Sequence, residues 1–257
     1  MFDLKNKTAI VTGGGSGIGR AIAVLFAKQG ADVQILDFDA DSAAMVVNEI
    51  KAGGGQASSI KCDVSNREQV KEIIRLIFKK NDRIDILVNN AGVAHVGNAE
   101  NTPEQDFNRL FNVNVKGVYN LLHAVLPLMK TKGGAILNMA SIASTVGIPD
   151  RFAYSMTKGA VVGMTLSTAK DYIAHRIRCN CISPARVHTP FVDGFIAKNY
   201  PGNEAEMFEK LSKTQPIGRM AEPIEIAHLA LYLCSDEASF ITGCDYPIDG
   251  GFIKLNN

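Results

Sequence analysis

The chain of 257 residues is long enough for one large domain or two small ones, and its 46% of apolar residues can fill a sizeable core. A formal net charge of +1 gives no reason to expect a nucleic-acid partner or an anionic membrane surface. The five cysteines include no Cys-x-x-Cys pair and the first residues hold no apolar signal core, so we expect a cytoplasmic protein without a disulfide framework or a metal site.

Short apolar, β-branched runs alternate with amphipathic segments along the whole chain. Strands are predicted at residues 8–12, 32–36, 58–62, 84–88, 135–139 and 178–182, with a short last strand near 246–247. Helices are predicted from the glycine-rich turn to residue 28, at 40–52, 66–80 and 102–130, around 154–158, and at 223–234. This order predicts an α/β fold over residues 1–257: a single-domain doubly wound Rossmann fold whose mostly parallel seven-stranded sheet is flanked by helices. No apolar run reaches the ~18 residues that a membrane span needs.

A glycine-rich turn follows the first predicted strand and opens the first predicted helix. It reads Gly13-Gly14-Gly15-Ser16-Gly17-Ile18-Gly19. Glycines let the backbone turn tightly and approach a ligand closely, and a helix N-terminus offers free N–H groups to a pyrophosphate. The spacing, Gly13-x-x-x-Gly17-x-Gly19, differs from the more familiar G-x-G-x-x-G. We expect this turn, with Ser16 and Ile18, to bind a dinucleotide; a flexible loop is the alternative.

Asp37 ends the second predicted strand, 18 residues after Gly19. A carboxylate at this place can accept hydrogen bonds from the ribose hydroxyls of a dinucleotide. It would also repel a 2′-phosphate, and no Lys or Arg at residues 13–19 counters it. Asp37 therefore favours NAD over NADP as the cofactor, although an ordinary aspartate at a strand end is the alternative reading.

Tyr154 and Lys158 are four residues apart, which places both on one face of a helix. A phenol titrates near ~10, and a nearby ammonium favours the phenolate and lowers that pKa. The pair can therefore act as an acid/base centre on a substrate hydroxyl or carbonyl. A solvated helix face is the alternative when the pair is considered alone.

In combination, these features resemble the classical short-chain dehydrogenase/reductase family over about residues 6–253. The order and spacing of the matching residues make the resemblance specific. They are Thr12-Gly13-x-x-x-Gly17-x-Gly19, Asp63, Asn89-Asn90-Ala91-Gly92, Asn114, Ser141, Tyr154-x-x-x-Lys158 and Asp249-Gly250-Gly251.

The resemblance implies an NAD-dependent oxidoreductase that acts on CH–OH groups. Tyr154 would be the acid/base on the substrate oxygen, Ser141 would hydrogen-bond the same oxygen, and Lys158 would lower the Tyr154 pKa and hold the nicotinamide ribose. Asn114 would interrupt its helix and hold a water that links Lys158 to solvent. The remaining implied cofactor contacts are Asp63, Val64, Asn90, Val187 and Thr189. The loop before the last two reads Pro184-Ala185, where the family commonly has Pro-Gly.

Three polar residues suggest the kind of substrate. Arg151 precedes Tyr154 by three residues, Arg186 follows the sixth predicted strand, and His95 follows the Asn-Asn-Ala-Gly turn. They could form a pocket with a fork for a carboxylate; a surface arginine and a loop histidine are the alternative. Together with Gly92-x-x-His95-x-Gly97 and Arg178-Cys179-Asn180-Cys181, the pattern resembles the branch of hydroxybutyrate and keto-deoxy sugar-acid dehydrogenases.

The resulting hypothesis is an NAD-dependent dehydrogenase of a small hydroxy acid or sugar acid. A 3-oxoacyl-carrier-protein reductase, a neutral sugar or polyol dehydrogenase, and a non-catalytic cofactor-binding protein are the alternatives. The resemblance also implies a homotetramer or homodimer that uses the apolar segment 240–252. The irregular stretch 189–215 interrupts the alternation and is predicted to be a substrate lid.

Overall fold

Seven short strands form one parallel sheet at the centre of the molecule, which the computed structural model describes over residues 1–255. The strands are β1 (Thr8–Thr12), β2 (Asp32–Asp37), β3 (Gln56–Lys61), β4 (Ile86–Asn89), β5 (Gly134–Met139), β6 (Ile177–Pro184) and β7 (Asp245–Ile248). Their spatial order is β3-β2-β1-β4-β5-β6-β7, and every neighbouring pair is parallel. The predicted single-domain doubly wound fold is therefore confirmed, with all seven strands running in one direction.

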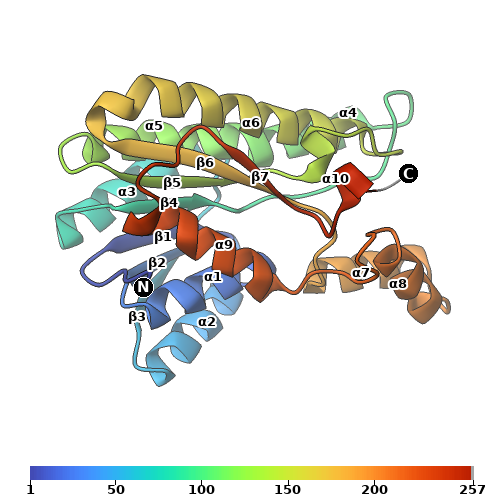
Figure 1. Cartoon of the computed structure of the whole chain (residues 1–257), viewed down its shortest axis with the longest axis horizontal. Helices are drawn as coiled ribbons and strands as arrows, with labels where there is room; N and C mark the ends of the chain where they lie inside the picture. Colours follow the sequence, from blue (N-terminus) through green and yellow to red (C-terminus); the bar gives the residue numbers. More distant parts are fainter. Residues whose placement is uncertain (256–257) are drawn as a thin grey trace.

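Helices cover both faces of this sheet (Figure 1). The helices are α1 (Gly17–Lys28), α2 (Ala40–Ala52), α3 (Arg67–Asn81), α4 (Glu104–Leu110), α5 (Gly117–Met129), α6 (Phe152–Tyr172), α7 (Pro190–Asn199), α8 (Glu204–Ser212), α9 (Pro223–Cys234) and α10 (Phe252–Leu255). Figure 1 shows α1, α2 and α9 on one face and α3, α5 and α6 on the other. Over residues 1–255, no helix is both long and apolar enough to cross a membrane.

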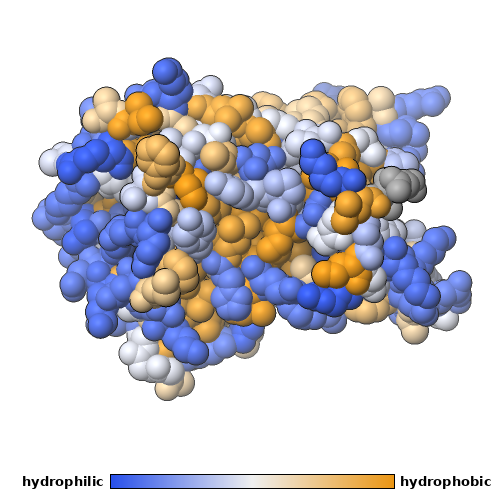
Figure 2. Space-filling model, viewed as in Figure 1, coloured by the Kyte–Doolittle hydropathy of each residue, from blue (hydrophilic) through white to orange (hydrophobic). Residues whose placement is uncertain are grey.

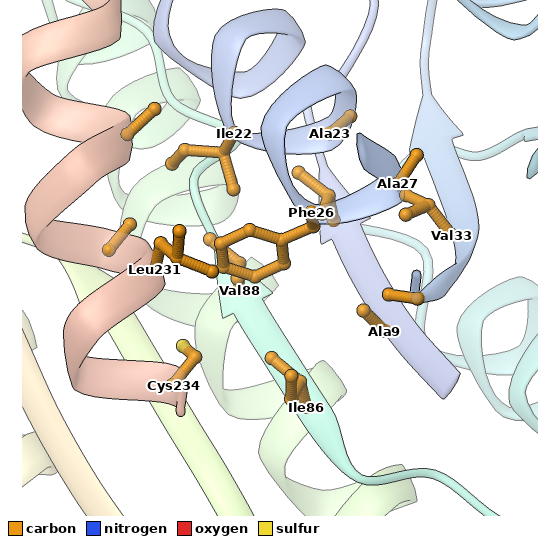
Figure 3. Close-up of a cluster of buried hydrophobic side chains, with 14 of the residues drawn as sticks. Ala9, Ile22, Ala23, Phe26, Ala27, Val33, Ile86, Val88, Leu231 and Cys234 are labelled. Atoms are coloured by element: carbon orange, nitrogen blue, oxygen red, sulfur yellow. The ribbon is translucent and has the colours of Figure 1, made fainter. Parts of the chain in front are cut away.

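Two hydrophobic clusters hold the layers together, one on each face of the sheet. On the first face the fully buried ring of Phe26 lies among Ile22, Val88 and Leu231 (Figure 3). Burying one such side chain stabilises the fold by about 1.5–3 kcal/mol. Because both faces of the sheet are covered, its strands carry apolar side chains on both sides, which explains the continuous apolar run of β1.

The long helix predicted at residues 102–130 is interrupted in the structure. It begins as α4, passes through a π-helical segment at Phe111–Lys116, and continues as α5. The Thr102 hydroxyl does not cap this helix, because it donates to the Asn98 carbonyl oxygen at 2.6 Å. The capping position is taken by Pro103, which has no side-chain oxygen to offer.

The stretch 189–215 was expected to be irregular, and this prediction was wrong. It contains α7 and α8, which project beyond the carboxyl ends of the strands, apart from the other helices (Figure 1). The reason is visible at the helix starts: Pro190 is the first residue of α7, and Glu204 and Glu206 lie in the first turn of α8. Proline suits a first helical position, and acidic residues suit the positive end of the helix dipole.

Candidate active site

A cleft of about 860 Å³ lies at the carboxyl edge of the sheet. The strand order reverses between β1 and β4, because the chain first extends the sheet outward to β3 and then returns to the other side of β1. In open α/β sheets, ligands bind outside the carboxyl ends of the strands at this point. The residues that line the cleft come from the turns after the strands, from α6, and from the α7–α8 segment.

The glycine-rich turn after β1 forms a tight cradle at one end of the cleft. Gly13 and Gly17 have left-handed backbones, with φ of +63° and +51°. A Cβ at Gly19 would lie 2.0 Å from the Gly13 carbonyl oxygen, so no other residue fits there without movement. Asn90 supports the turn by donating to the same oxygen at 3.1 Å. Because α1 has no acidic residue in its first turn, this cradle fits the pyrophosphate of a dinucleotide.

The structure brings most of the predicted cofactor residues to the cleft. Those that line it are Gly13, Ser16, Gly17, Ile18, Asp37, Asp63, Val64, Asn90, Tyr154, Lys158, Val187 and Thr189. Gly19 lies behind this surface. The Asp37 carboxylate is fixed because its Oδ2 accepts the Gly15 amide at 2.8 Å, so it keeps one orientation at the end of β2.

Tyr154, Ser141 and Lys158 meet where β5 ends against α6. The Ser141 hydroxyl oxygen accepts the Ala143 amide at 3.2 Å, and Ser141 hydrogen-bonds the Tyr154 phenol. Lys158 is buried, lies 5.7 Å from the centre of the Tyr154 ring, and donates through Nζ to the Met139 carbonyl oxygen at 2.7 Å. The arrangement places a phenol, a hydroxyl and an ammonium side by side on one wall of the cleft.

Burial controls the acid/base properties of this group. It raises the pKa of Tyr154, while the hydrogen bond from Ser141 and the positive charge of Arg151 lower that pKa. Burial also lowers the pKa of Lys158 to about 8. That Lys158 lowers the Tyr154 pKa stays a prediction. Its ammonium lies 5.7 Å from the centre of the Tyr154 ring and donates to the Met139 carbonyl.

Asn114 lies beneath the cleft inside the π-helical segment, so the expectation that its helix is interrupted is confirmed. Its Oδ1 accepts the Val93 amide at 2.9 Å, and its Nδ2 donates to the Val93 carbonyl at 2.9 Å and to the Thr157 hydroxyl at 3.1 Å. These bonds join the turn after β4 to α6 next to Lys158. Short π-helical insertions occur frequently at functional sites.

Two of the three predicted substrate residues reach the cleft. Arg151 donates to the His95 carbonyl at 3.3 Å, and its guanidinium carbon lies 5.6 Å from the centre of the Phe195 ring. Arg186 is half-buried and donates through Nε to the Thr214 hydroxyl at 3.0 Å. Burial and, secondarily, the nearby Arg151 charge lower the pKa of Arg186. The two guanidinium groups therefore share one positive region of the cleft.

The side chain of His95 does not line the cleft, so its expected contact with substrate is not supported. Asp106 of α4 holds the imidazole, with Nδ1 3.4 Å from a carboxylate oxygen, and Nε2 is buried without a hydrogen-bond partner among the described residues. The contribution of His95 to the cleft is instead its backbone carbonyl, which holds Arg151.

Several cleft residues were not predicted from the sequence. The aromatic and basic ones among them are Phe38, Arg109, Phe191, Phe195 and Phe252. Thr189 lies against the glycine turn, because a Cβ at Gly17 would be 3.3 Å from its methyl carbon. Phe191 and Phe195 lie in the stretch 189–215, and the predicted role of that stretch as a substrate lid could have indicated them. Nothing in the sequence marked Phe38 or Arg109 as cleft residues. Phe252 follows the turn at Asp249, whose carboxylate accepts the Gly251 amide at 2.9 Å.

Comparison with known proteins agrees with this geometry. Residues 13–253 match the family model described as enoyl-(acyl carrier protein) reductase. Dehydrogenase/reductase SDR family member 6 of Xenopus laevis is 39% identical over 254 residues, which cover 98% of this chain and 99% of that protein. The 3-oxoacyl-[acyl-carrier-protein] reductase FabG of Thermotoga maritima is 34% identical over 97% of this chain and 99% of its own. The solved aldohexose dehydrogenase of Thermoplasma acidophilum has a TM-score of 0.87 and 33% identity, covering 97% of this chain and 95% of that one.

The fold and the cleft define a nucleotide-dependent oxidoreductase of the doubly wound class. More specifically, the chain belongs to the classical short-chain dehydrogenase/reductase family, whose members use nicotinamide cofactors. It is therefore an oxidoreductase that acts on CH–OH groups of a small-molecule substrate.

The buried Lys158 makes a testable contribution to stability. Its pKa is about 8 in the folded chain, against an ordinary value of 10.5, so the unfolded chain binds more protons between these pH values. The wild-type free energy of unfolding should therefore rise with pH from 8 to 10.5. Below pH 8 the burial of the charged lysine lowers this free energy by its full amount, about 3 kcal/mol. Losing the bond to Met139 costs about 1 kcal/mol, so Lys158→Met should be more stable than wild type by about 2 kcal/mol at pH 7.

Urea denaturation at pH 7 and at pH 10 measures this difference. The advantage of Lys158→Met should shrink at the higher pH, where the wild-type lysine is neutral in the folded chain. Lys170→Met, at an exposed position of the same helix, is the control and should match wild type at both pH values. A variant less stable than wild type at pH 7 would contradict the expected penalty.

Proposed function

We propose that this chain is an NAD-dependent dehydrogenase that moves a hydride between nicotinamide and the secondary alcohol or ketone of a small hydroxy acid or sugar acid. The observation that carries this proposal is the pair Arg151 and Arg186 in the cleft that holds Tyr154. Among the described residues, neither guanidinium forms an ion pair with a carboxylate. Two partly buried like charges in one cleft are unfavourable unless an anion joins them, and guanidinium groups suit a carboxylate.

The proposed chemistry assigns the proton to Tyr154. In alcohol oxidation its phenolate takes the proton of the substrate hydroxyl, and in ketone reduction its phenol returns that proton. Ser141 donates a hydrogen bond to the same substrate oxygen and fixes its position. When bound, the nicotinamide supplies the hydride chemistry, while the protein positions and polarises the substrate.

Lys158 and Asn114 support this centre in the proposal. We propose that the Lys158 ammonium leaves the Met139 carbonyl to hold the nicotinamide ribose. Its pKa, lowered to about 8, supports proton exchange near neutral pH. Asn114 holds the turn at Val93 against α6, and we propose that a water beside it links Lys158 to solvent.

We propose NAD as the cofactor because the adenosine end of the cleft carries negative charge. Asp37 and Asp63 both line it, and no Lys or Arg belongs to the glycine turn. A 2′-phosphate would meet the fixed Asp37 carboxylate, whereas ribose hydroxyls would donate to it. The proposed cofactor contacts are those residues with Gly13, Ser16, Gly17, Ile18, Gly19, Val64, Asn90, Val187 and Thr189.

Two other substrates have support from the relatives. The name of the Thermotoga protein favours a 3-oxoacyl-carrier-protein reductase, and the name of the Thermoplasma protein favours a neutral sugar dehydrogenase. Asp37 speaks against the first, because such reductases usually take NADPH. The arginine pair speaks against the second, because a neutral sugar leaves both positive charges without a partner.

Arg151→Leu tests the substrate class. We expect it to raise the KM for 3-hydroxybutyrate or fuconate by roughly tenfold or more, since a charge-assisted hydrogen bond is worth about 1.5–3 kcal/mol. The KM for 1,3-butanediol or fucose should stay unchanged. The rates are measured as absorbance of reduced nicotinamide, and Arg75→Leu, at an exposed position of α3, controls for loss of one charge. Wild-type turnover of the neutral compounds alone would reject the acid-substrate proposal.

Asp37→Ser tests the cofactor. The variant removes the charge that repels a 2′-phosphate, so the ratio of kcat/KM with NADP to that with NAD should rise by roughly tenfold or more. Asp41→Ser, at an exposed position in the first turn of α2, is the matched control and should leave the ratio unchanged. A wild-type enzyme that already prefers NADP would overturn the assignment and favour the carrier-protein reductase.

Two exposed apolar surfaces support a homotetramer. Within the described residues 1–255, β7 pairs with β6 and with no other strand. Phe240, shortly before β7, is fully exposed, and Figure 2 shows hydrophobic residues gathered around β7 and α9. On the outer side of α5 and α6, Tyr119, Phe152 and Leu166 are 43%, 49% and 50% exposed. Two distinct surfaces allow two kinds of contact, which a tetramer uses and a dimer does not. Light scattering should give about four times 27.7 kDa, and a monomer mass would exclude the assembly.

A further inference from the structure

The lid segment contributes an aromatic ring to the proposed anion site. We propose that Phe195 of α7 is a positioning residue, which holds the Arg151 guanidinium in place for the acidic group of the substrate. This inference rests on the proposed function, because it explains how the Arg151 side chain of the proposed anion site is oriented. It also gives the α7–α8 segment a specific task in substrate selection beyond covering the cleft.

Arg151 is held from two sides by groups that leave its charge unbalanced. Its guanidinium carbon lies 5.6 Å from the centre of the Phe195 ring, and Nη1 donates to the His95 carbonyl at 3.3 Å. The ring and the carbonyl both attract a cation without neutralising it. A carboxylate in place of the ring or the carbonyl would have neutralised the Arg151 charge, which a substrate anion needs.

Orientation matters here because an arginine side chain has many rotamers. Fixing such a side chain costs conformational entropy, and an arginine that is already held does not lose that entropy when the substrate binds. A cation–π contact is worth about 0.5–2 kcal/mol, depending on how far it is desolvated. Phe195 and Arg151 both line the cleft, and Phe195 is only partly exposed, so the contact is sheltered.

A second aromatic residue of the lid extends the same arrangement. The Phe195 and Tyr200 rings form an edge-to-face pair with centres 6.2 Å apart. The Phe195 ring therefore lies between the Arg151 guanidinium and a second aromatic ring of the same segment. Phe191 of the same helix also lines the cleft, but it is 60% exposed and lies over no cation among the described residues.

Phe195→Leu, with Phe191→Leu as its matched control, tests the inference in the full-length enzyme. Leucine keeps an apolar side chain on α7 and removes the ring. We expect the KM for 3-hydroxybutyrate, relative to that for 1,3-butanediol, to rise about 2- to 30-fold in Phe195→Leu and to stay unchanged in Phe191→Leu. In an Arg151→Leu background, Phe195→Leu should have no further effect on this ratio, since the two residues act as one unit.

Phe195→Trp provides a second readout that does not depend on turnover. The chain contains no tryptophan, so this variant has a single indole, and indole is the strongest aromatic partner for a cation. Its relative KM for 3-hydroxybutyrate should stay within about twofold of wild type. Its emission should change when 3-hydroxybutyrate is added in the presence of reduced NAD, with which this alcohol cannot react, and this change should be lost in Phe195→Trp combined with Arg151→Leu.

The outcomes separate this inference from the proposed function. A wild-type enzyme that does not prefer the acid overturns both. If wild type prefers the acid and Arg151→Leu removes the preference, but Phe195→Leu behaves like Phe191→Leu, the positioning role alone is overturned. It is also overturned if Phe195→Leu slows the acid and the diol equally, because the ring would then serve only to pack the lid.

Discussion

The carboxyl ends of all the parallel strands meet at one edge of the sheet, and the cleft depends on that meeting. The glycine turn, Asp37, Asn90, Ser141 and Arg186 follow five different strands and are far apart in sequence. A parallel arrangement brings the turns after these strands together at one edge of the sheet. The opposite edge carries polar pairs, such as Arg83 with Asp85, which tie strand ends together and contribute nothing to the cleft.

The cleft is an electrostatically costly part of the fold. It desolvates a lysine, a phenol and an arginine, which lowers the pKa of Lys158 and Arg186 and raises that of Tyr154. Such a site reduces stability in exchange for reactive groups near neutral pH. The two apolar layers offset this cost, because a cluster of buried hydrophobic side chains packs the helices against each face of the sheet.

Much of the fold and of the candidate site could be predicted from the sequence, for reasons that differ between elements. The strands were predictable because β-branched runs bounded by helical patterns are a local signal, and the glycine turn because its backbone needs residues without Cβ. The orientation of side chains in the cleft could not be predicted from local sequence. Asp106 of α4 decides how the His95 imidazole is oriented, and the Arg151 charge that lowers the Tyr154 pKa was not expected from the sequence. The ring above Arg151 comes from α7, which sequence pattern alone left as an irregular stretch.

The π-helical segment at Phe111–Lys116 has a consequence for how this chain can vary in length. A π-turn accommodates one more residue than an α-helical turn over a similar rise, and that residue turns Asn114 inward toward Val93 and Thr157. Removing a single residue there would restore regular helix but rotate everything after it by about 100°. The buried face of α5, with Leu121 and Val125, would then point away from the sheet. Spacing at this turn is therefore under tighter constraint than the identity of most side chains around it.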